Sequence, residues 1–340
     1  MLRLPPFDVA RPETVSEAVA LLAEHAGRAM VVAGGTDLVP NMKHELFTPE
    51  LLVALYEVAE LRGIRSEEDG TLAIGAMTPL ATVAADPTVR RHAPALAQAT
   101  GLVAGPQLRR MGTLGGNVLL DTRCQWYNQT YFWREALGFC MKKDGEVCHV
   151  VAGGSKCVAA ASNDSAPVLM TLGARLRIAG PEGRRELPLD DFWVADGIYN
   201  KRLQPDEVLV EIAVPPQAPG HRGAYGKLRD RGSIDFPLLG VAVRLDLDSE
   251  GTVADADLVT IALQARPVRI KKVADLLAGT RPGKSDFDDA VEAVARQAHR
   301  QCHPMPNIPG DADYRRAMVP VYVRRTLRAA AEGTGPVHHL

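Results

Sequence analysis

The sequence predicts a mixed α+β protein of two or three domains. Its 340 residues are enough for a sizeable buried core. In the first two thirds, short apolar runs alternate with helical patterns, and two glycine pairs interrupt them. In the last third, strand-like segments precede helical ones, which is typical of an α+β domain. Hydrophobic residues make up 46% and charged residues 24%, as in ordinary globular proteins.

The first expected element is a helix over 14–26, which Thr14 or Ser16 can cap. A short strand, Ala29–Val32, follows and ends at a glycine pair. The turn at 68–70 predicts a hairpin between strands over 64–66 and 72–74. The remaining expected elements before residue 120 are helices over 80–85 and 89–100 and a glycine turn over 112–117.

The C-terminal third begins after 215–223, a segment rich in Pro and Gly that is the best candidate for a domain boundary. The last residues, 333–340, are expected to form a frayed tail. Between these two segments we expect strands over 224–228, 238–247 and 258–263, and then helices over 268–277, 286–300 and 314–332.

The charge balance excludes several partners. Lys and Arg number 39 and Asp and Glu number 41, so no strong field indicates nucleic acid or an anionic membrane. The N-terminus has no apolar run of signal-peptide length, and no later run is long enough to cross a bilayer. We therefore expect a cytoplasmic protein. In a reducing compartment, clustered cysteines are more often metal ligands or redox groups than disulfides.

Two glycine turns share one local design: VVAGGTDL at 31–38 and MGTLGGNV at 111–118. Adjacent glycines allow positive φ and remove the Cβ atoms that keep a ligand away from the backbone. Successive N–H groups can then form a nest that accepts a phosphate or pyrophosphate. Neither turn has the G-x-G-x-x-G spacing, and there is no P-loop lysine. Each alone is also compatible with a plain tight turn.

The combination VAGGTDL and VAGPQLRRMGTLGGNV resembles the FAD-binding medium subunits of the xanthine dehydrogenase and carbon monoxide dehydrogenase family. The resemblance continues in GAMTP (75–79), SND (162–164), DEVLVEIAVP (206–215), AYGKLRDR (224–231) and DYRRAMVPVYVRRTL (313–327). It implies the two-lobed FAD-binding fold of the vanillyl-alcohol oxidase type over 1–217, with lobes at about 1–58 and 59–217. A C-terminal domain over 218–332, like that of the carbon monoxide dehydrogenase flavoprotein, and a tail at 333–340 would complete the chain.

The resemblance also implies a set of cofactor residues. The two glycine loops would hold the FAD pyrophosphate through Val32, Ala33, Gly34, Gly35, Thr36, Asp37 and Leu38, and through Thr113, Gly115, Gly116 and Asn117. Val103 would pack near the cofactor, Asp164 would form a hydrogen bond with it, and Leu209 and Lys227 would lie near the flavin. No Ser-His-Asp or paired-carboxylate arrangement can be singled out, so we predict no catalytic residue, as suits an electron-transfer subunit.

Residues 121–160 form an insert with unusual composition. Four of the five cysteines, Cys124, Cys140, Cys148 and Cys157, lie here with 15, 7 and 8 residues between them. Four thiolates satisfy one [4Fe–4S] cluster. A zinc site needs the same number, but it usually shows close C-x₂₋₄-C pairs, and none occurs. Buried, unligated thiols are the third possibility. Six aromatic residues of the insert could shield a cluster: Trp126, Tyr127, Tyr131, Phe132, Trp133 and Phe139.

The first cysteine of the insert, Cys124, comes seven residues after Asn117, and the path from Asn117 to Asp164 takes 47 residues, so both ends of the insert are anchored beside the cofactor region. With its run GGNVLLDTRCQWYNQ, the insert resembles the flavin subunits of 4-hydroxybenzoyl-CoA reductases. Cys302, far away in sequence, is not needed as a ligand, and His149 is more simply a bystander.

That resemblance implies electrons passing from ferredoxin through a [4Fe–4S] cluster and FAD toward partner [2Fe–2S] clusters and molybdenum. The implied partners are a large molybdopterin subunit and a small subunit with two [2Fe–2S] clusters, in a dimer of heterotrimers. Two alternatives stay open. One is a hydroxylase that oxidises another aromatic or heterocyclic compound, and the other is a zinc-stabilised assembly module.

Overall fold

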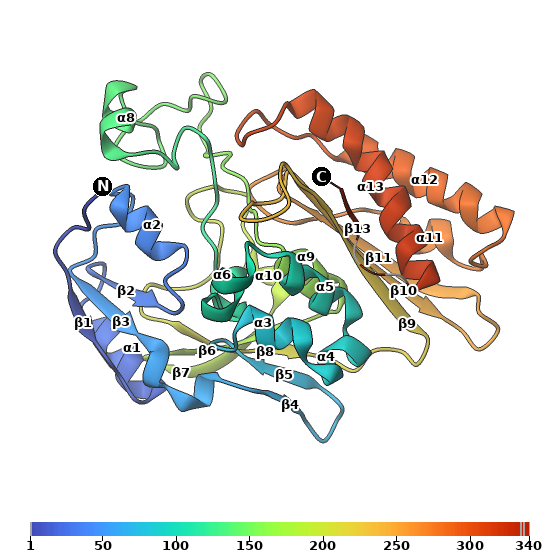
Figure 1. Ribbon diagram of the computed structural model, residues 1–340, viewed down its shortest axis with the longest axis horizontal. Coiled ribbons are helices and arrows are strands. Elements are labelled where there is room, and N and C mark those ends of the chain that lie inside the picture. Colours follow the sequence, from blue (N-terminus) through green and yellow to red (C-terminus); the bar gives the residue numbers. More distant parts are fainter. Residues whose placement is uncertain (1, 334, 336, 340) are drawn as a thin grey trace.

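A computed structural model describes residues 2–333, 335 and 337–339, and the chain forms three sheets (Figure 1). The first sheet is parallel, with the order β1 (Asp8–Ala10), β3 (Leu51–Ala54), β2 (Ala29–Val32). Its helix α1 (Val15–Glu24) begins where predicted, since the Thr14 hydroxyl accepts from the Glu17 N–H at 3.2 Å. The other elements are α2 (Leu38–Lys43) and the 3₁₀ turns η1 (Leu55–Glu57) and η2 (Ala59–Leu61).

The second sheet is antiparallel, with the order β4-β5-β8-β6-β7. Its strands are β4 (Ile64–Ser66), β5 (Leu72–Gly75), β6 (Arg175–Gly180), β7 (Gly183–Pro188) and β8 (Val208–Val214). The predicted hairpin at 64–74 is present as β4 and β5. The helices between these strands are α3 (Leu80–Ala85), α4 (Pro87–His92), α5 (Pro94–Leu102), α6 (Pro106–Met111), α7 (Leu114–Val118), α8 (Tyr131–Ala136), α9 (Ser165–Thr171) and α10 (Leu189–Phe192).

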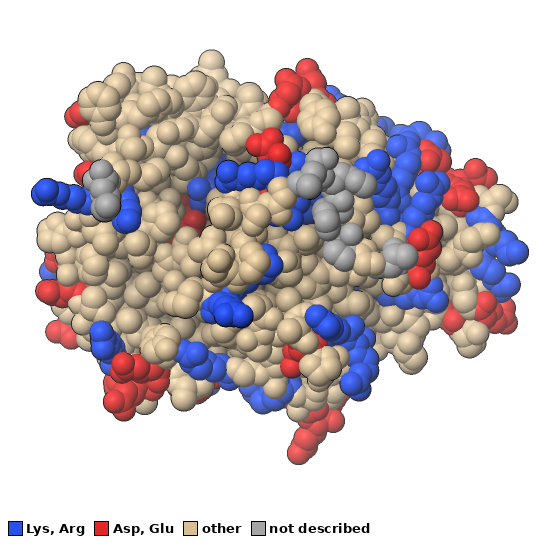
Figure 2. Space-filling model, viewed as in Figure 1, with Lys and Arg blue, Asp and Glu red and all other residues tan. Residues whose placement is uncertain are grey.

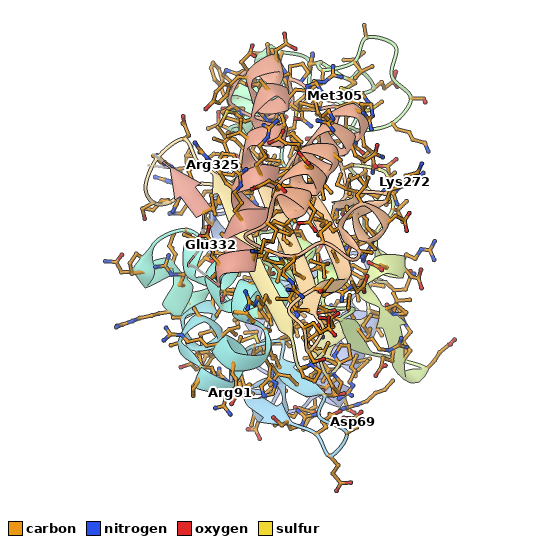
Figure 3. All side chains as sticks on the ribbon, turned by 90° about the vertical axis from the view of Figure 1, so that its right-hand side faces the viewer. Asp69, Arg91, Lys272, Met305, Arg325 and Glu332 are labelled. Atoms are coloured by element: carbon orange, nitrogen blue, oxygen red, sulfur yellow. The ribbon has the colours of Figure 1, made fainter. Side chains whose placement is uncertain are left out.

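The third sheet has the order β12-β11-β10-β9-β13. Its strands are β9 (His221–Leu228), β10 (Leu239–Leu247), β11 (Val253–Ile261), β12 (Val268–Arg269) and β13 (Val337–His339), and its helices are α11 (Val273–Leu277), α12 (Ser285–Gln301) and α13 (Ala312–Glu332). Figure 3, which looks at the right-hand side of Figure 1, shows α12 and α13 lying across this sheet, with Arg325 and Glu332 on α13.

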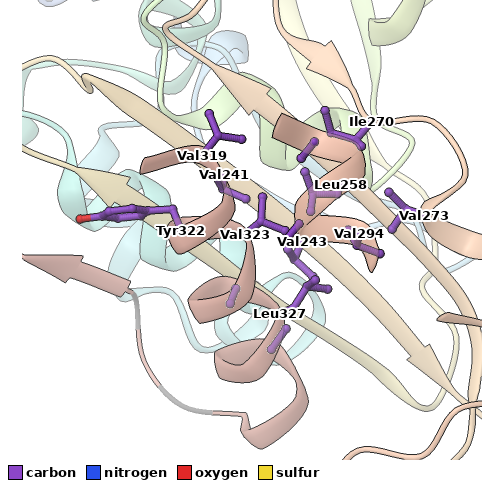
Figure 4. Packing of buried hydrophobic residues seen from close by; sticks show 14 of the residues in the cluster. Val241, Val243, Leu258, Ile270, Val273, Val294, Val319, Tyr322, Val323 and Leu327 are labelled. Atoms are coloured by element: carbon purple, nitrogen blue, oxygen red, sulfur yellow. The ribbon is translucent and has the colours of Figure 1, made fainter. Parts of the chain in front are cut away.

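Both faces of the third sheet are buried, because successive strand residues point to opposite sides. On one side Val241, Val243 and Leu258 pack against Val323 of α13 and Val294 of α12 (Figure 4). On the other side Tyr225, Ala242 and Val259 share a core with residues of α5 and α9, among them Leu96, Ala99, Val168 and Leu169. The third sheet is therefore continuous with the core of the second sheet, and the two parts meet over a buried apolar surface.

Four sequence expectations were wrong. The helix expected over 89–100 is broken in two, because Ala93 adopts φ −142° and ψ 61° before Pro94, which starts α5. The glycine turn at 112–117 contains a short helix, α7. The helix expected over 268–277 begins as strand β12 and becomes helical only after Lys272, which has φ 66°.

The fourth error is the frayed tail. Val337–His339 pairs in parallel with β9 and forms the edge of the third sheet, while residues 334, 336 and 340 lie outside the described part of the chain. None of the helices among the described residues combines the length and apolar character that crossing a bilayer requires.

Candidate cofactor site and cysteine insert

A cavity of about 750 Å³ lies where the three sheets meet. Both glycine turns line it, together with residues from 198–209 and from the connection between β9 and β10. All the predicted cofactor residues line this cavity except Val32, which lies in β2, and Lys227, which lies behind the cavity wall. The volume and the mixed apolar and polar lining are those of a small-molecule site.

The first glycine turn brings bare backbone into the cavity. Gly35 has φ 68°, which is the left-handed conformation that glycine adopts without strain. At Gly34 a Cβ atom would overlap the Met111 carbonyl, so the two glycine turns lie directly against each other. Within the described chain, the N–H groups of Gly34, Gly35 and Thr36 have no protein acceptor. These donors are available to an anionic ligand.

In the second glycine turn, the N–H groups of both adjacent glycines already donate to acceptors of the protein. The Gly115 N–H donates to the Ala76 carbonyl at 2.9 Å, and the Gly116 N–H donates to the Thr113 hydroxyl at 3.1 Å. Gly115 is also required for packing, since its Cβ would lie 2.7 Å from the Ala76 Cβ and 2.8 Å from the Ala76 oxygen. The second turn therefore supplies a close wall, whereas the first supplies hydrogen-bond donors. Asn117 links the wall to α9, because its Oδ1 accepts from Ser165 N–H at 3.1 Å.

A buried ion pair, formed by Asp164 and Lys227, lies at the cavity wall beside the start of α9. Asp164 lines the cavity, and its carboxylate accepts from the Tyr225 hydroxyl at 2.7 Å and from Lys227 Nζ at 3.1 Å. Lys227 is fully buried and also donates to the Leu102 carbonyl at 3.1 Å. Burial raises the pKa of Asp164, while Lys227 and Tyr225 act in the opposite direction. The predicted Lys227 thus acts on the site through Asp164.

Two positively charged side chains line the cavity but were not among the predicted cofactor residues. Arg123 donates to Asp37 Oδ1 at 3.0 Å, and its guanidinium lies 3.8 Å from the centre of the Phe236 ring. Lys201 Nζ donates to the carbonyls of Leu119 and Leu120 at 2.9 and 3.1 Å. Burial lowers the pKa of Lys201 to about 8. Single basic residues in loops form no sequence pattern, so nothing in the sequence distinguished these two.

Three of the four cysteines of the insert lie in one cluster, and the fourth does not. Cys124, Cys140 and Cys157 are buried in one small apolar cluster with Tyr127, while Cys148 is half-buried. Burial raises the pKa of Cys124 to about 12, and the thiols of Cys157, Cys140 and Cys148 add to that rise. A Cβ at Gly197 would lie 2.6 Å from Cys157 Sγ, so this glycine leaves room for the sulfur.

Among the described residues, no group of three or more His, Cys, Asp or Glu side chains is arranged to hold a metal ion. A zinc ion needs four ligand atoms at about 2.0–2.3 Å. A [4Fe–4S] cluster takes one cysteine at each of four irons, so its thiolates surround a larger body. The arrangement of the thiols therefore does not match a single-ion site, and the predicted iron–sulfur cluster stays a prediction.

The aromatic residues of the insert mostly contact one another. Trp126 lies 6.0 Å from Trp133 and 5.5 Å from the ring of His149, measured between ring centres. His149 Nε2 is 2.6 Å from the Phe139 carbonyl oxygen, so this ring nitrogen is held within the insert. On the face in Figure 2 the surface over the insert is mostly uncharged, whereas both signs of charge are mixed over the C-terminal helices.

A glycine-lined cavity with available backbone donors defines the class of proteins that bind a phosphate-bearing cofactor. Residues 5–217 match the FAD binding domain in molybdopterin dehydrogenase, and residues 223–330 match the CO dehydrogenase flavoprotein C-terminal domain. The chain therefore belongs to the family of FAD-binding medium subunits of xanthine dehydrogenase and carbon monoxide dehydrogenase, which are oxidoreductase subunits. The predicted fold class is confirmed.

Known relatives match nearly full length. The chain is 34% identical to the carbon monoxide dehydrogenase medium chain of Hydrogenophaga pseudoflava, covering 96% of this chain and 97% of that one. It is 28% identical to a putative xanthine dehydrogenase FAD-binding subunit of Escherichia coli, covering 97% and 98%. Among solved structures, the Hydrogenophaga pseudoflava enzyme superposes with a TM-score of 0.79 at 32% identity, covering 98% and 100%. Quinoline 2-oxidoreductase from Pseudomonas putida 86 gives 0.76 at 25% identity, covering 97% and 99%.

Proposed function

We propose that this chain is the electron-transfer subunit of a molybdenum hydroxylase-type complex and holds FAD in the glycine-lined cavity. The observation that carries the proposal is the set of available N–H groups at Gly34, Gly35 and Thr36, residues that line a cavity of about 750 Å³. The pyrophosphate would accept from these donors, with the second glycine turn as a close wall. FAD, when bound, supplies exchange between one-electron and two-electron carriers.

The partner subunits follow from the relatives, which are named as medium chains or FAD-binding subunits. We propose that the chain assembles with a large molybdopterin-binding subunit and a small subunit with two [2Fe–2S] clusters, in a dimer of heterotrimers. Substrate chemistry would then occur on the large subunit. The lack of a recognisable acid–base or nucleophile set in the sequence supports this division.

We further propose that the insert binds a [4Fe–4S] cluster through Cys124, Cys140, Cys148 and Cys157. Three of the thiols share one apolar cluster, which suits a group whose potential depends on exclusion of water. The insert departs from the cavity wall at Asp121, so a cluster there would lie near the cofactor. The cluster would exchange single electrons with an external carrier, of which ferredoxin is the proposed example.

The reaction that the sequence of the insert favours is reductive removal of a phenolic hydroxyl from an aromatic CoA thioester, as in 4-hydroxybenzoyl-CoA reductase. That reaction consumes two electrons and two protons and releases water, so two one-electron donors are needed for each turnover. The second candidate is oxidation of another aromatic or heterocyclic substrate, with electrons leaving through the cluster. The relatives, which are named as dehydrogenases and a hydroxylase, favour this second direction.

Cofactor analysis of anaerobically purified chain tests the proposal. We expect one FAD per chain, together with about four iron and four sulfide. Cys148→Ser should reduce the iron content and leave FAD bound, whereas Cys302→Ser, which alters a buried thiol outside the insert, should change neither.

Chain without FAD would contradict the electron-transfer function. Chain with FAD and about one zinc would contradict only the iron–sulfur part, and would favour the zinc-stabilised module for the insert. Redox titration then decides the direction of electron flow: a cluster potential near that of ferredoxin favours reduction of the substrate, and one far above it favours oxidation.

A further inference from the structure

The segment 121–123 joins the second glycine turn to the cysteine insert, and its charged side chains are held in ion pairs. Lys142 Nζ, within the insert, donates to Asp121 Oδ1 at 2.9 Å. Arg123 Nη1 donates to Asp37 Oδ1 at 3.0 Å. Asp121 and Arg123 also line the cavity, and Cys124 follows at once. Asp121 and Arg123 therefore belong both to the cavity wall and to the base of the insert.

Arg123 lies in the chain between β5 and β6 of the second sheet, and its side chain contacts segments next to the other two sheets. Through Asp37 it holds the first glycine turn, which follows the first sheet. Its guanidinium lies over the ring of Phe236, in the connection between two strands of the third sheet, at 3.8 Å from the ring centre. The Arg123 side chain is 20% exposed and that of Asp37 is 31% exposed, so this ion pair is partly shielded from bulk water, which strengthens it.

The β9–β10 connection, 229–238, needs such a contact. Ile234 has φ 54°, a strained conformation for a β-branched residue, and its side chain is 58% exposed at the cavity. Two contacts hold it from within the connection: Arg231 Nε donates to the Ile234 carbonyl at 3.0 Å, and Arg229 pairs with Asp235 at 2.6 Å. Strained backbone persists only where its surroundings fix it, and Arg123 supplies the contact from the opposite wall.

We propose that Arg123 is a positioning residue that closes the cavity by fixing Phe236 and the first glycine turn, and that its charge favours reduced flavin. This proposal rests on the binding of FAD proposed above. Reduction adds negative charge to the flavin, so a guanidinium held in the cavity wall stabilises the reduced form more than the oxidised form. The residue next to the insert thereby sets both the affinity and the potential of the cofactor.

Arg123→Met is the direct test. The dissociation constant of FAD should rise about tenfold, in the range expected for loss of a partly buried ion pair and a ring contact. The flavin midpoint potential should fall, and a tenfold greater loss of affinity for the reduced form corresponds to about 30 mV for a two-electron couple. Arg62→Met is the matched control, because Arg62 lies over Tyr56 at 5.0 Å but does not line the cavity.

Two further variants separate geometry from charge. Arg123→Lys keeps the charge but loses the planar contact, so it should weaken FAD binding while moving the potential less than Arg123→Met does. Phe236→Leu removes the ring and should likewise weaken binding with little change in potential. These variants also carry the test if Arg123→Met does not fold.

Trypsin cleavage after Arg231 gives a readout that needs no flavin. In FAD-free protein, Arg123→Met should be cleaved there severalfold faster than wild type, because the connection loses its outer contact. If the wild type bound no FAD, the proposed function would be wrong. The cleavage rates of FAD-free wild type and Arg123→Met would still test the role of Arg123. Wild-type affinity, potential and cleavage rate in Arg123→Met would overturn the inference.

Discussion

The cavity and the insert lie side by side, but the chain builds them in opposite ways. Where the two glycine turns form its wall, the cavity is made of backbone: Gly34 and Gly115 approach neighbouring carbonyls so closely that a side chain would not fit. The insert is made of side chains, and between residues 121 and 160 its one described helix is α8 (Tyr131–Ala136). Regular, tightly packed backbone leaves little freedom, whereas a loop held by a few side chains opens more easily.

The insert is attached to the rest of the protein mainly through contacts of single side chains and through its two ends. Arg134 is buried and donates to Asp144 at 3.0 Å and to the Glu45 carbonyl, beyond α2, at 3.2 Å. At its base, the Gln125 N–H donates to the Asn307 carbonyl at 2.7 Å. The comparison therefore predicts that changes near the cavity destabilise the whole protein, and that changes in the insert open it locally.

The largest effect is expected at the buried ion pair between Lys227 and Asp164. Lys227→Met leaves Asp164 buried without its ion-pair partner, and should lower the free energy of unfolding by about 3–5 kcal/mol. Chemical denaturation measures this loss, with Lys271→Met as the exposed control. A loss below about 1 kcal/mol is typical of an ion pair at the surface. Such a small loss would show that this buried ion pair is not what joins the second and third sheets.

The next largest effect is expected at the second glycine turn, which forms a close wall of the cavity. Gly115→Ala places a Cβ 2.7 Å from the Ala76 Cβ and should cost about 1–3 kcal/mol, with loss of bound FAD. Gly101→Ala is the matched control, since its Cβ would meet Ala84 at an ordinary 3.7 Å and should be tolerated. Flavin fluorescence after denaturation gives the FAD content. Full occupancy in Gly115→Ala would mean that close approach at this wall is not required.

A smaller and local effect is expected in the insert. Arg134→Met removes the contacts to Asp144 and Glu45, so amide exchange over 131–148 should become about tenfold faster. The midpoint of global unfolding should hardly change. Hydrogen-exchange mass spectrometry resolves the two quantities, with exposed Arg110→Met as control. A large fall in global stability would contradict the separation of insert and cavity.

The smallest effect depends on pH and concerns Lys201. Its pKa is lowered to about 8 in the folded protein, against an ordinary value of 10.5, so the unfolded chain binds more protons between these values. Stability of the wild type should therefore rise between pH 8 and pH 9 relative to Lys201→Met, by about 1 kcal/mol. Urea unfolding at both pH values measures this difference. Parallel curves for the two proteins would show that Lys201 is not desolvated.

The sequence predicted the parts of this arrangement that depend on local chemistry. Paired glycines mark both turns, the cysteine spacing marks the insert, and the cap of α1 lies where Thr14 indicated. The Pro94 break was also readable, since proline cannot continue the preceding helix. What the sequence could not give are contacts between distant segments, because no local pattern encodes them. Arg123 on Phe236 and the pairing of β13 with β9 are of this kind.

A structure of the chain with FAD bound tests the proposed role of the first glycine turn most directly. We expect one FAD in the glycine-lined cavity, with pyrophosphate oxygens within hydrogen-bond distance of the N–H groups of Gly34, Gly35 and Thr36. A cofactor bound elsewhere, or a pyrophosphate facing away from the first glycine turn, would contradict that role.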